Sequence, residues 1–172
     1  VQEHPGSASA GQLLLHCIRG LGDVLTGRRD GMGLLFPGGS AELVARFYAA
    51  NPVMEQYNRL LGEVLRTAAA GGALHVLEVG AGTGATTRVV LAALSGTGVH
   101  YTYTDVSSAF VRLGRHEFGD RPGTDFRVLD IERPPAEQGF AAEPGYAGVL
   151  ATNVLHATRR IGATLEHLKD LL

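Results

Sequence analysis

The first residues that suggest chemistry form a glycine-rich loop. Gly80, Gly82 and Gly84 follow the apolar run LHVLEV, with one residue between each pair, and a segment of helical character comes next. Glycine permits a tight turn with positive φ and removes the side chains that would hold a ligand away from the backbone. The start of a helix adds unpaired N–H groups and a partial positive charge. The loop therefore suits a phosphate or carboxylate group of a ligand.

Acidic side chains stand at the ends of the neighbouring apolar runs. Asp105 closes the run HYTYTD, where a carboxylate can accept hydrogen bonds from both hydroxyls of a ribose, in NAD or in S-adenosylmethionine. Asp130 closes the run DFRVLD and could accept from an adenine amino group, with Ile131 against the ring. Glu78 directly precedes the glycines and favours a ligand with an ammonium or sulphonium charge over pyrophosphate.

Each of these signals has a plainer explanation. The glycines also satisfy the loose dinucleotide fingerprint G-x-G-x-x-A, so an NAD-linked enzyme stays an alternative, and they could form a simple turn. Asp105 could cap the next helix, Asp130 could belong to a turn, and Glu78 could pair with a nearby arginine. The site is therefore a hypothesis that depends on how the elements bring these residues together.

The elements that would position these residues alternate between strand and helix. Apolar runs predict strands at 74–79, 100–105, 125–130 and 147–153, and helical spacing predicts helices at about 84–94, 108–118 and 158–171. This alternation implies parallel strands joined by right-handed crossovers. The carboxyl ends of such strands form one ligand-binding edge. The predicted fold is α/β, a Rossmann-like parallel sheet flanked by helices.

The chain before the first strand is predicted to be helical. A first helix is expected up to Leu25, a loop over 27–39, and a short helix after Ser40. Asn51 is predicted to cap a further helix with Pro52 at its first position, which ends near Gly71. The expected organisation has three parts: a linker over 1–11, a helical region over 12–72, and an α/β core over 73–172.

Composition narrows the classes of function. A formal net charge of −2 gives no basic footprint for nucleic acid or an anionic membrane, and no apolar run approaches the roughly 20 residues of a membrane span. The only cysteine, Cys17, cannot form an internal disulfide, so a reducing cytoplasm is the simplest expectation. No paired Cys or His spacing predicts a metal site.

Several motifs together resemble the C-methyltransferase domain embedded in modular polyketide synthases. LEVGAGTGATT, YTYTDVSSAF, FRVLDIE and ATNVLHAT resemble its core, and LLFPGGSAELVARFY resembles its N-terminal helical lid, from about Leu34 to the end. The resemblance implies a class I methyltransferase fold with S-adenosylmethionine as cofactor. The residues it assigns to the cofactor are Glu78, Gly80, Gly82, Gly84, Asp105, Asp130, Ile131 and Asn153.

The resemblance also implies an activity and partners. Such domains methylate the α-carbon of a β-ketoacyl thioester on an acyl carrier protein, beside neighbouring synthase domains. It assigns the role of general base to His156, because the ordinary pKa of histidine near 6.5 suits proton removal. Such a base typically raises the reaction rate by roughly 10²–10⁴-fold. Asn153 would hold the methionine part or cap the next helix. Tyr57 would close the lid over the site or pack in the core.

The sequence departs from the family pattern in two places. The family continues beyond a helix like the one ending at Leu172, into a strand with a glutamate that orients the histidine, so the last strands of the core are expected to be missing. Where the family has Tyr-Asp, this chain has Tyr146 followed by Ala147 and Gly148. Two alternatives follow: a degenerate pseudo-methyltransferase acting as a scaffold within the synthase, and a relative with altered chemistry, such as O- or N-methylation or a metal-assisted variant.

Overall fold

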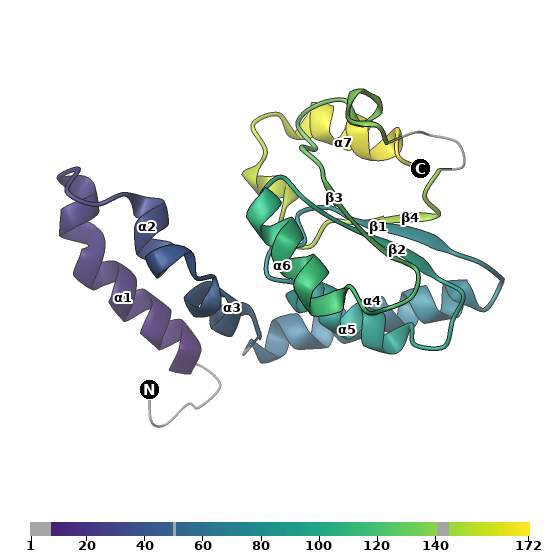
Figure 1. Cartoon of the computed structure of the whole chain (residues 1–172), viewed down its shortest axis with the longest axis horizontal. Helices are drawn as coiled ribbons and strands as arrows, with labels where there is room; N and C mark the ends of the chain where they lie inside the picture. Colours follow the sequence, from purple (N-terminus) through teal and green to yellow (C-terminus); the bar gives the residue numbers. More distant parts are fainter. Residues whose placement is uncertain (1–7, 50, 141–144) are drawn as a thin grey trace. The chain divides into compact units, whose positions relative to one another are not determined.

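The computed structural model describes residues 8–49, 51–140 and 145–172, which form two compact units that divide between Asn58 and Arg59. Four helices begin in the first unit, drawn in purple and blue in Figure 1. They are α1 (Ala8–Leu25), α2 (Gly31–Leu35), α3 (Glu42–Ala49) and α4 (Pro52–Ala69), with a 3₁₀ turn η2 (Pro37–Gly39) between α2 and α3. Among the described residues, no helix is long and apolar enough to cross a membrane.

The predicted start of α4 is confirmed in detail. The side-chain oxygen of Asn51 accepts hydrogen bonds from the N–H groups of Val53 and Met54, at 3.1 and 3.2 Å. Pro52 occupies the first helical position, where its missing N–H has no consequence. The cap therefore fixes where α4 begins.

Two expectations for the N-terminal part are wrong. Residues 8–11 belong to α1 and not to a linker, because the alanines at 8 and 10 favour the helix; the first seven lie outside the described residues. The expected loop over 27–39 contains α2, because Asp30 caps it by accepting from Gly33 N–H at 2.8 Å. Leu34 is buried in α2 and occupies the space that Gly20 leaves open on α1.

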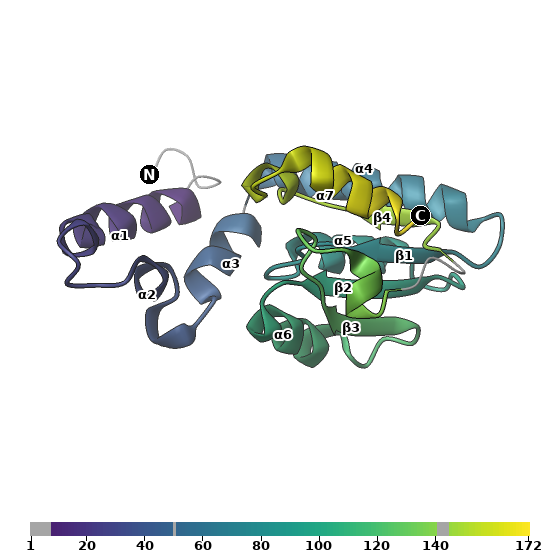
Figure 2. The same cartoon turned by 90° about the horizontal axis from the view of Figure 1, so that it is seen from above.

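The second unit contains the predicted parallel sheet. Its strands are β1 (His75–Glu78), β2 (His100–Asp105), β3 (Thr124–Val128) and β4 (Gly148–Leu150). The spatial order is β3-β2-β1-β4, all neighbours are parallel, and Figure 2 shows the four strands in this order. The α/β fold class is therefore confirmed, and the ends of β2 match the predicted ones, whereas the other strands are shorter than the predicted runs.

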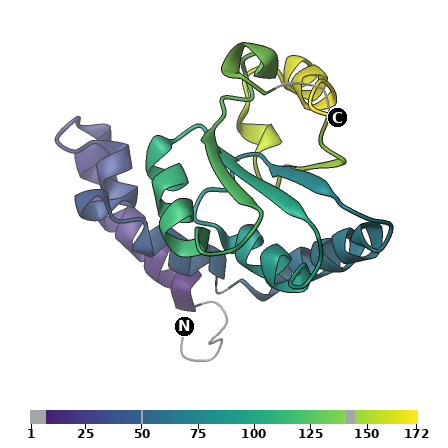
Figure 3. The same cartoon turned by 45° about the vertical axis from the view of Figure 1, so that its right-hand side comes forward.

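Helices cover both faces of the sheet, as Figures 1 and 3 show. On one face α5 (Ala85–Ala93) and α6 (Ser108–Phe118) pack through Val90, Val111 and Phe118 against Tyr101 and Tyr103 of β2. On the other face the segment around α7 (Ile161–Lys169) joins a cluster with β1. That cluster consists of Leu77, Val79, Leu129, Ile131, Phe140 and Leu171. Of two further 3₁₀ turns, η3 (Pro135–Gln138) lies between β3 and β4, and η4 (Leu155–Ala157) lies between β4 and α7.

The unit boundary lies inside α4 and not at the expected position between residues 72 and 73. The second half of α4 belongs to the α/β unit because Leu61 and Leu65 pack in its core. Gly62 lies so close to α5 that a Cβ on it would be 2.8 Å from the Cβ of Ala93. Close helix packing therefore assigns this half of α4 to the sheet.

Candidate active site

The glycine loop is strongly bent, and only one of its three glycines leaves space for a ligand. Gly80, Gly82 and Gly84 all have left-handed backbone, with φ of 62°, 58° and 74°. A Cβ on Gly80 would lie 2.5 Å from Cγ2 of Val154, and one on Gly84 would lie 2.6 Å from the Phe118 ring. A Cβ on Gly82 would meet nothing nearer than 3.9 Å. The outer glycines therefore make room for the protein's own side chains, and Gly82 offers bare backbone to a ligand.

Side chains of β2 hold the Gly82 peptide groups on both sides. The Gly82 N–H donates to Oδ2 of Asp105 at 2.9 Å, and the Gly82 carbonyl accepts from the hydroxyl of Tyr103 at 2.7 Å. Burial raises the pKa of Tyr103 well above its usual value, so the phenol stays neutral and donates. Tyr103 was not among the residues predicted from the sequence; its signal is the alternation of tyrosines along HYTYTD, which places Tyr101 and Tyr103 on one face.

Asp105 lies at the carboxyl end of β2, as predicted, and its carboxylate is engaged by the protein itself. Oδ1 accepts from the N–H of Ser107 at 2.8 Å, so the alternative role of Asp105 at the start of the next helix is also present. Burial raises the pKa of Asp105 above its ordinary value. An ionised carboxylate has about four acceptor positions, so two hydrogen bonds from the backbone leave capacity for the hydroxyls of a ribose.

Glu78 does not face an open ligand surface, in contrast to the expectation that it would meet a cationic ligand. Its side chain is 1% exposed, and Oε2 accepts from Thr87 Oγ1 at 2.5 Å and from the Tyr101 hydroxyl at 2.7 Å. Within the described residues, no arginine pairs with Glu78, which was the plainer alternative. Burial raises the pKa of Glu78 to about 6. The carboxylate thus joins β1, β2 and α5 beneath the loop.

Of the two residues predicted to contact the adenine after β3, Asp130 lies in a turn and Ile131 lies in the core. Asp130 Oδ1 accepts from the N–H of Glu132 at 3.0 Å, which is the turn predicted as the plainer alternative, while Asp130 also lines a cavity. Ile131 is 6% exposed and packs with Phe140 and Leu171 on the α7 face of the sheet. The structure therefore does not present Ile131 to a ligand ring, because the side chain after Asp130 points to the other face.

The candidate base lies after β4, beside the glycine loop. Val154 fills the space above Gly80, which brings the segment containing Asn153 and His156 to the loop. Asn153 is exposed and has left-handed backbone with φ 60°. His156 lies in η4 with an exposed imidazole that has no hydrogen-bond or ion-pair partner within the described parts of the chain. A reactant at this edge can therefore reach the ring.

Tyr57 belongs to the N-terminal unit, on the first half of α4. Its side chain is 64% exposed, so the expectation of core packing, the plainer alternative for this residue, is wrong. An exposed phenol at this position leaves the lid role as a prediction.

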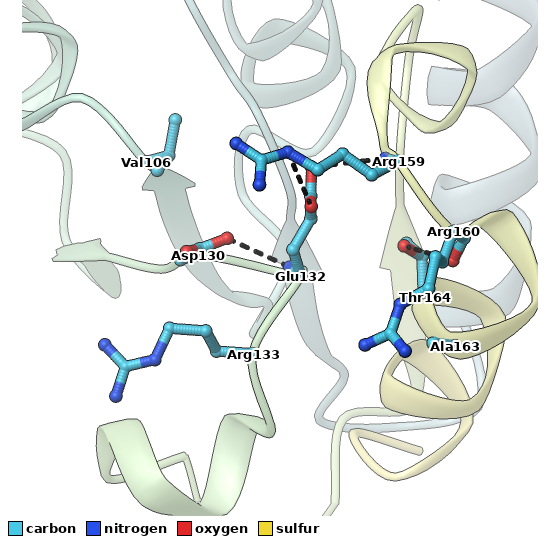
Figure 4. A pocket seen from close by; sticks show the side chains of 8 residues that line it. All are labelled: Val106, Asp130, Glu132, Arg133, Arg159, Arg160, Ala163 and Thr164. Atoms are coloured by element: carbon cyan, nitrogen blue, oxygen red, sulfur yellow. Dashed lines mark hydrogen bonds and ion pairs between the residues drawn. The ribbon is translucent and has the colours of Figure 1, made fainter.

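A cavity of about 820 Å³ opens beside the strand ends. Figure 4 shows its lining side chains, which come from the ends of β2 and β3 and from the segment that leads into α7. They are Val106, Asp130, Glu132, Arg133, Arg159, Arg160, Ala163 and Thr164. Among the residues that the structure describes, no group of three or more His, Cys, Asp or Glu side chains is arranged to hold a metal ion.

Comparisons with known proteins agree with this fold and with the position of the site. A family model described as a methyltransferase domain matches residues 77–172, from the end of β1 through α7. The chain belongs to this methyltransferase domain family. The match covers the glycine loop, Asp105, Asp130 and His156 together.

Curated relatives of this methyltransferase domain are polyketide synthases. Polyketide synthase ThaQ of Burkholderia thailandensis is 46% identical over 161 residues, which are 87% of this chain and 8% of ThaQ. The highly reducing polyketide synthase gloL of Glarea lozoyensis is 36% identical over 169 residues, 96% of this chain and 6% of gloL. The chain thus spans less than a tenth of either relative.

Solved structures extend the likeness to nearly the whole of this chain, which covers less than half of each of them. The CurJ carbon methyltransferase has a TM-score of 0.92 at 32% identity, over 99% of this chain and 46% of that one. The DszA carbon methyltransferase has a TM-score of 0.88 at 38% identity, over 98% and 45%. The trans-methyltransferase CalH, solved with S-adenosylhomocysteine, has a TM-score of 0.77 at 29% identity, over 97% and 46%.

These findings confirm the resemblance, the fold class and an S-adenosylmethionine-dependent methyltransferase over an NAD-linked enzyme. The site also fits that cofactor on its own geometry. The methyltransferase domain has bare backbone at Gly82, acceptor capacity at Asp105 and a cavity between Val106 and Asp130. The roles of individual residues stay predictions.

Proposed function

We propose that this domain acts within a polyketide synthase, where it methylates the α-carbon of a β-ketoacyl thioester carried by an acyl carrier protein. The observation that carries the proposal is the likeness, over nearly the whole chain, to solved carbon methyltransferases. The curated relatives named above are polyketide synthases, which supports neighbouring synthase domains as partners. The exposed histidine beside the glycine loop supports the same chemistry.

The residues proposed to hold the cofactor lie along the strand ends. Backbone at Gly82 receives the amino-acid part, with Asn153 beside it, and Asp105 accepts from the ribose. Asp130 receives the adenine amino group at the cavity wall. S-adenosylmethionine supplies an electrophilic methyl group when it is bound. Tyr103 and Asp105 keep the Gly82 peptides in place through their hydrogen bonds.

His156 is the proposed general base. The proton on a carbon between two carbonyl groups is acidic enough for an imidazole nitrogen to remove near neutral pH. The ring of His156 is exposed, so a substrate can reach it without displacing a neighbour. The contact between Val154 and Gly80 holds this segment next to the loop, which satisfies the need for base and methyl donor at one place.

The test is methyl transfer to a β-ketoacyl acyl carrier protein, with His156→Ala compared against His116→Ala. Both histidines are exposed, and His116 lies on α6, outside the residues proposed to hold the cofactor or to act as the base. We expect His156→Ala to lower the rate by roughly 10²–10⁴-fold with the affinity for S-adenosylhomocysteine nearly unchanged. His116→Ala should behave like the wild type. An equal fall in rate and in cofactor affinity with His156→Ala would show that this residue is structural.

A second candidate is a scaffold that has lost catalysis. It is favoured by one observation: both oxygens of Asp105 are already hydrogen-bonded to the protein's own N–H groups. Titration calorimetry with S-adenosylhomocysteine separates the two candidates. Micromolar binding supports the methyltransferase, whereas no binding to the folded domain supports the scaffold.

A further inference from the structure

We propose that Arg133, Arg159 and Arg160 form a phosphate-binding site in the cavity, which takes the phosphate of the phosphopantetheine arm that carries the acyl chain. The identity of the ligand rests on the proposed function. The site itself rests on the residues that line the cavity.

The arginines stand on two walls of one cavity. Arg133 belongs to the loop after β3, which also carries Asp130 and Glu132. Arg159 and Arg160 belong to the opposite wall, directly before α7. Figure 4 shows the guanidinium groups of Arg159 and Arg160 extending from that wall into the space between the two walls. A ligand between the walls therefore meets the guanidinium donors of Arg159 and Arg160, whereas the Arg133 side chain lines the cavity from the loop and extends away from that wall.

These guanidinium groups are weakly engaged. Arg159 Nε lies 3.9 Å from a carboxylate oxygen of Glu132, and its side chain is 90% exposed. Arg133 lies 4.0 Å from Glu137, and both side chains are mainly exposed. Within the described residues, Arg160 has no ion-pair partner. Exposed pairs at such distances contribute little, so the groups are available to a phosphate, whose geometry matches the guanidinium donors.

The two acids in the cavity are partly committed to the backbone. Asp130 accepts from the N–H of Glu132, and Glu132 Oε1 accepts from the N–H of Arg159 at 3.3 Å. The three arginines that line the cavity carry more positive charge than the two carboxylates carry negative charge. The first turn of α7 adds to the positive side, because α7 has no side-chain cap and Ala163 of that turn lines the cavity. The balance on this wall therefore favours an anion.

The position suits an arm that delivers a substrate to the proposed base. Arg159 follows His156 by three residues, and three residues of chain span at most about 11 Å. A phosphate held by Arg159 therefore lies within one length of the flexible pantetheine arm from His156, so the acyl end of the arm can reach the base. Asp130, assigned to the cofactor, lies at the end of β3, whereas Arg159 and Arg160 stand on the opposite wall, which leaves that wall for a second ligand.

The first test measures binding to the full 172-residue chain by calorimetry, with 4′-phosphopantetheine and pantetheine as probes. We expect the phosphate to improve affinity about tenfold, the lower end for a hydrogen bond to a charged group at an exposed site. The double variant Arg159→Gln/Arg160→Gln should lose this preference, and Arg160→Lys should keep part of it. Arg112→Gln, an exposed arginine on α6, is the control and should keep it fully. Equal affinity for the two probes, or a preference that survives in the double variant, overturns the proposal.

A second test separates this inference from the proposed function. Methyl transfer is measured with acetoacetyl thioesters of pantetheine and of phosphopantetheine. Methylation of both with equal kcat/KM overturns the phosphate site and leaves the proposed function standing. No methylation of either thioester or of an acetoacetyl acyl carrier protein, with the binding preference retained, refutes the proposed function and supports the phosphate site. Inorganic phosphate should compete with phosphopantetheine only weakly; equal affinity for inorganic phosphate overturns the assignment to the carrier arm.

Discussion

Replacement of the buried Glu78 by glutamine should remove the loss of stability with rising pH that this carboxyl group contributes. Burial raises the pKa of Glu78 from 4.5 to about 6. The folded state therefore binds this proton more tightly than the unfolded state, so the wild type loses stability as the pH rises from about 4.5 to above 6. A rise of this size corresponds to about 2 kcal/mol. The penalty is absent below about pH 4.5 and fully present near pH 7.

Glutamine tests this because it keeps the shape and removes the charge. Thr87 and Tyr101 both donate to the same oxygen of Glu78, so the single oxygen of an amide can accept both hydrogen bonds. Any fixed cost of burying the amide nitrogen is the same at every pH. The difference in unfolding free energy, variant minus wild type, should therefore grow by about 2 kcal/mol in favour of the variant between about pH 4.5 and 7.

The measurement is urea unfolding at several pH values, followed by circular dichroism. Glu63→Gln is the matched control, because Glu63 is exposed on α4 and pairs only with Arg66, in a contact that contributes little. Its difference from the wild type should stay nearly constant with pH. A flat difference for Glu78→Gln, or one that moves in the opposite direction, would refute the argument that burial dominates the titration of this group.

Three further predictions concern the glycine loop, its support from β2 and the cap of α4. Gly80→Ala should lower stability by roughly 2–5 kcal/mol in urea unfolding, because the added methyl group combines positive-φ strain with a clash against Val154. Gly82→Ala should lower stability by only about 1–2 kcal/mol, from the strain alone, and should weaken S-adenosylhomocysteine binding more than Gly80→Ala does. Tyr103→Phe should lower stability by about 1–2 kcal/mol and also weaken that binding, both measured on one preparation. Asn51→Ala should remove about 1 kcal/mol in thermal unfolding by loss of the cap, with no change in cofactor affinity.

Much of the architecture could be predicted because it is encoded locally. The run HYTYTD begins and ends where β2 does, and Ser108–Phe118 is helical as its spacing indicates. The cap at Asn51 also depends on neighbouring residues alone. Strand and helix alternation then limits the topology to parallel strands with a common ligand edge.

The depth and direction of individual side chains could not be predicted in this way. Glu78 and Ile131 stand next to ligand-facing positions in the sequence, yet one is buried beneath the loop and the other packs on the opposite face. A side chain at Gly80 or Gly84 would clash with Val154 or Phe118, and both of these residues are distant in the sequence. These contacts exist only in the folded chain, so no local pattern reports them.

Because α4 supplies residues to both units, the α/β part cannot be excised at the apparent end of the helical region. A fragment that starts at residue 73 would lack Leu61 and Leu65 and would expose the apolar surface of α5 that they cover. Such a piece should aggregate or fold loosely, since uncovered apolar surface of this kind promotes association. Dissection of the chain for crystallisation or for fusion to other proteins should therefore retain the whole of Pro52–Ala69.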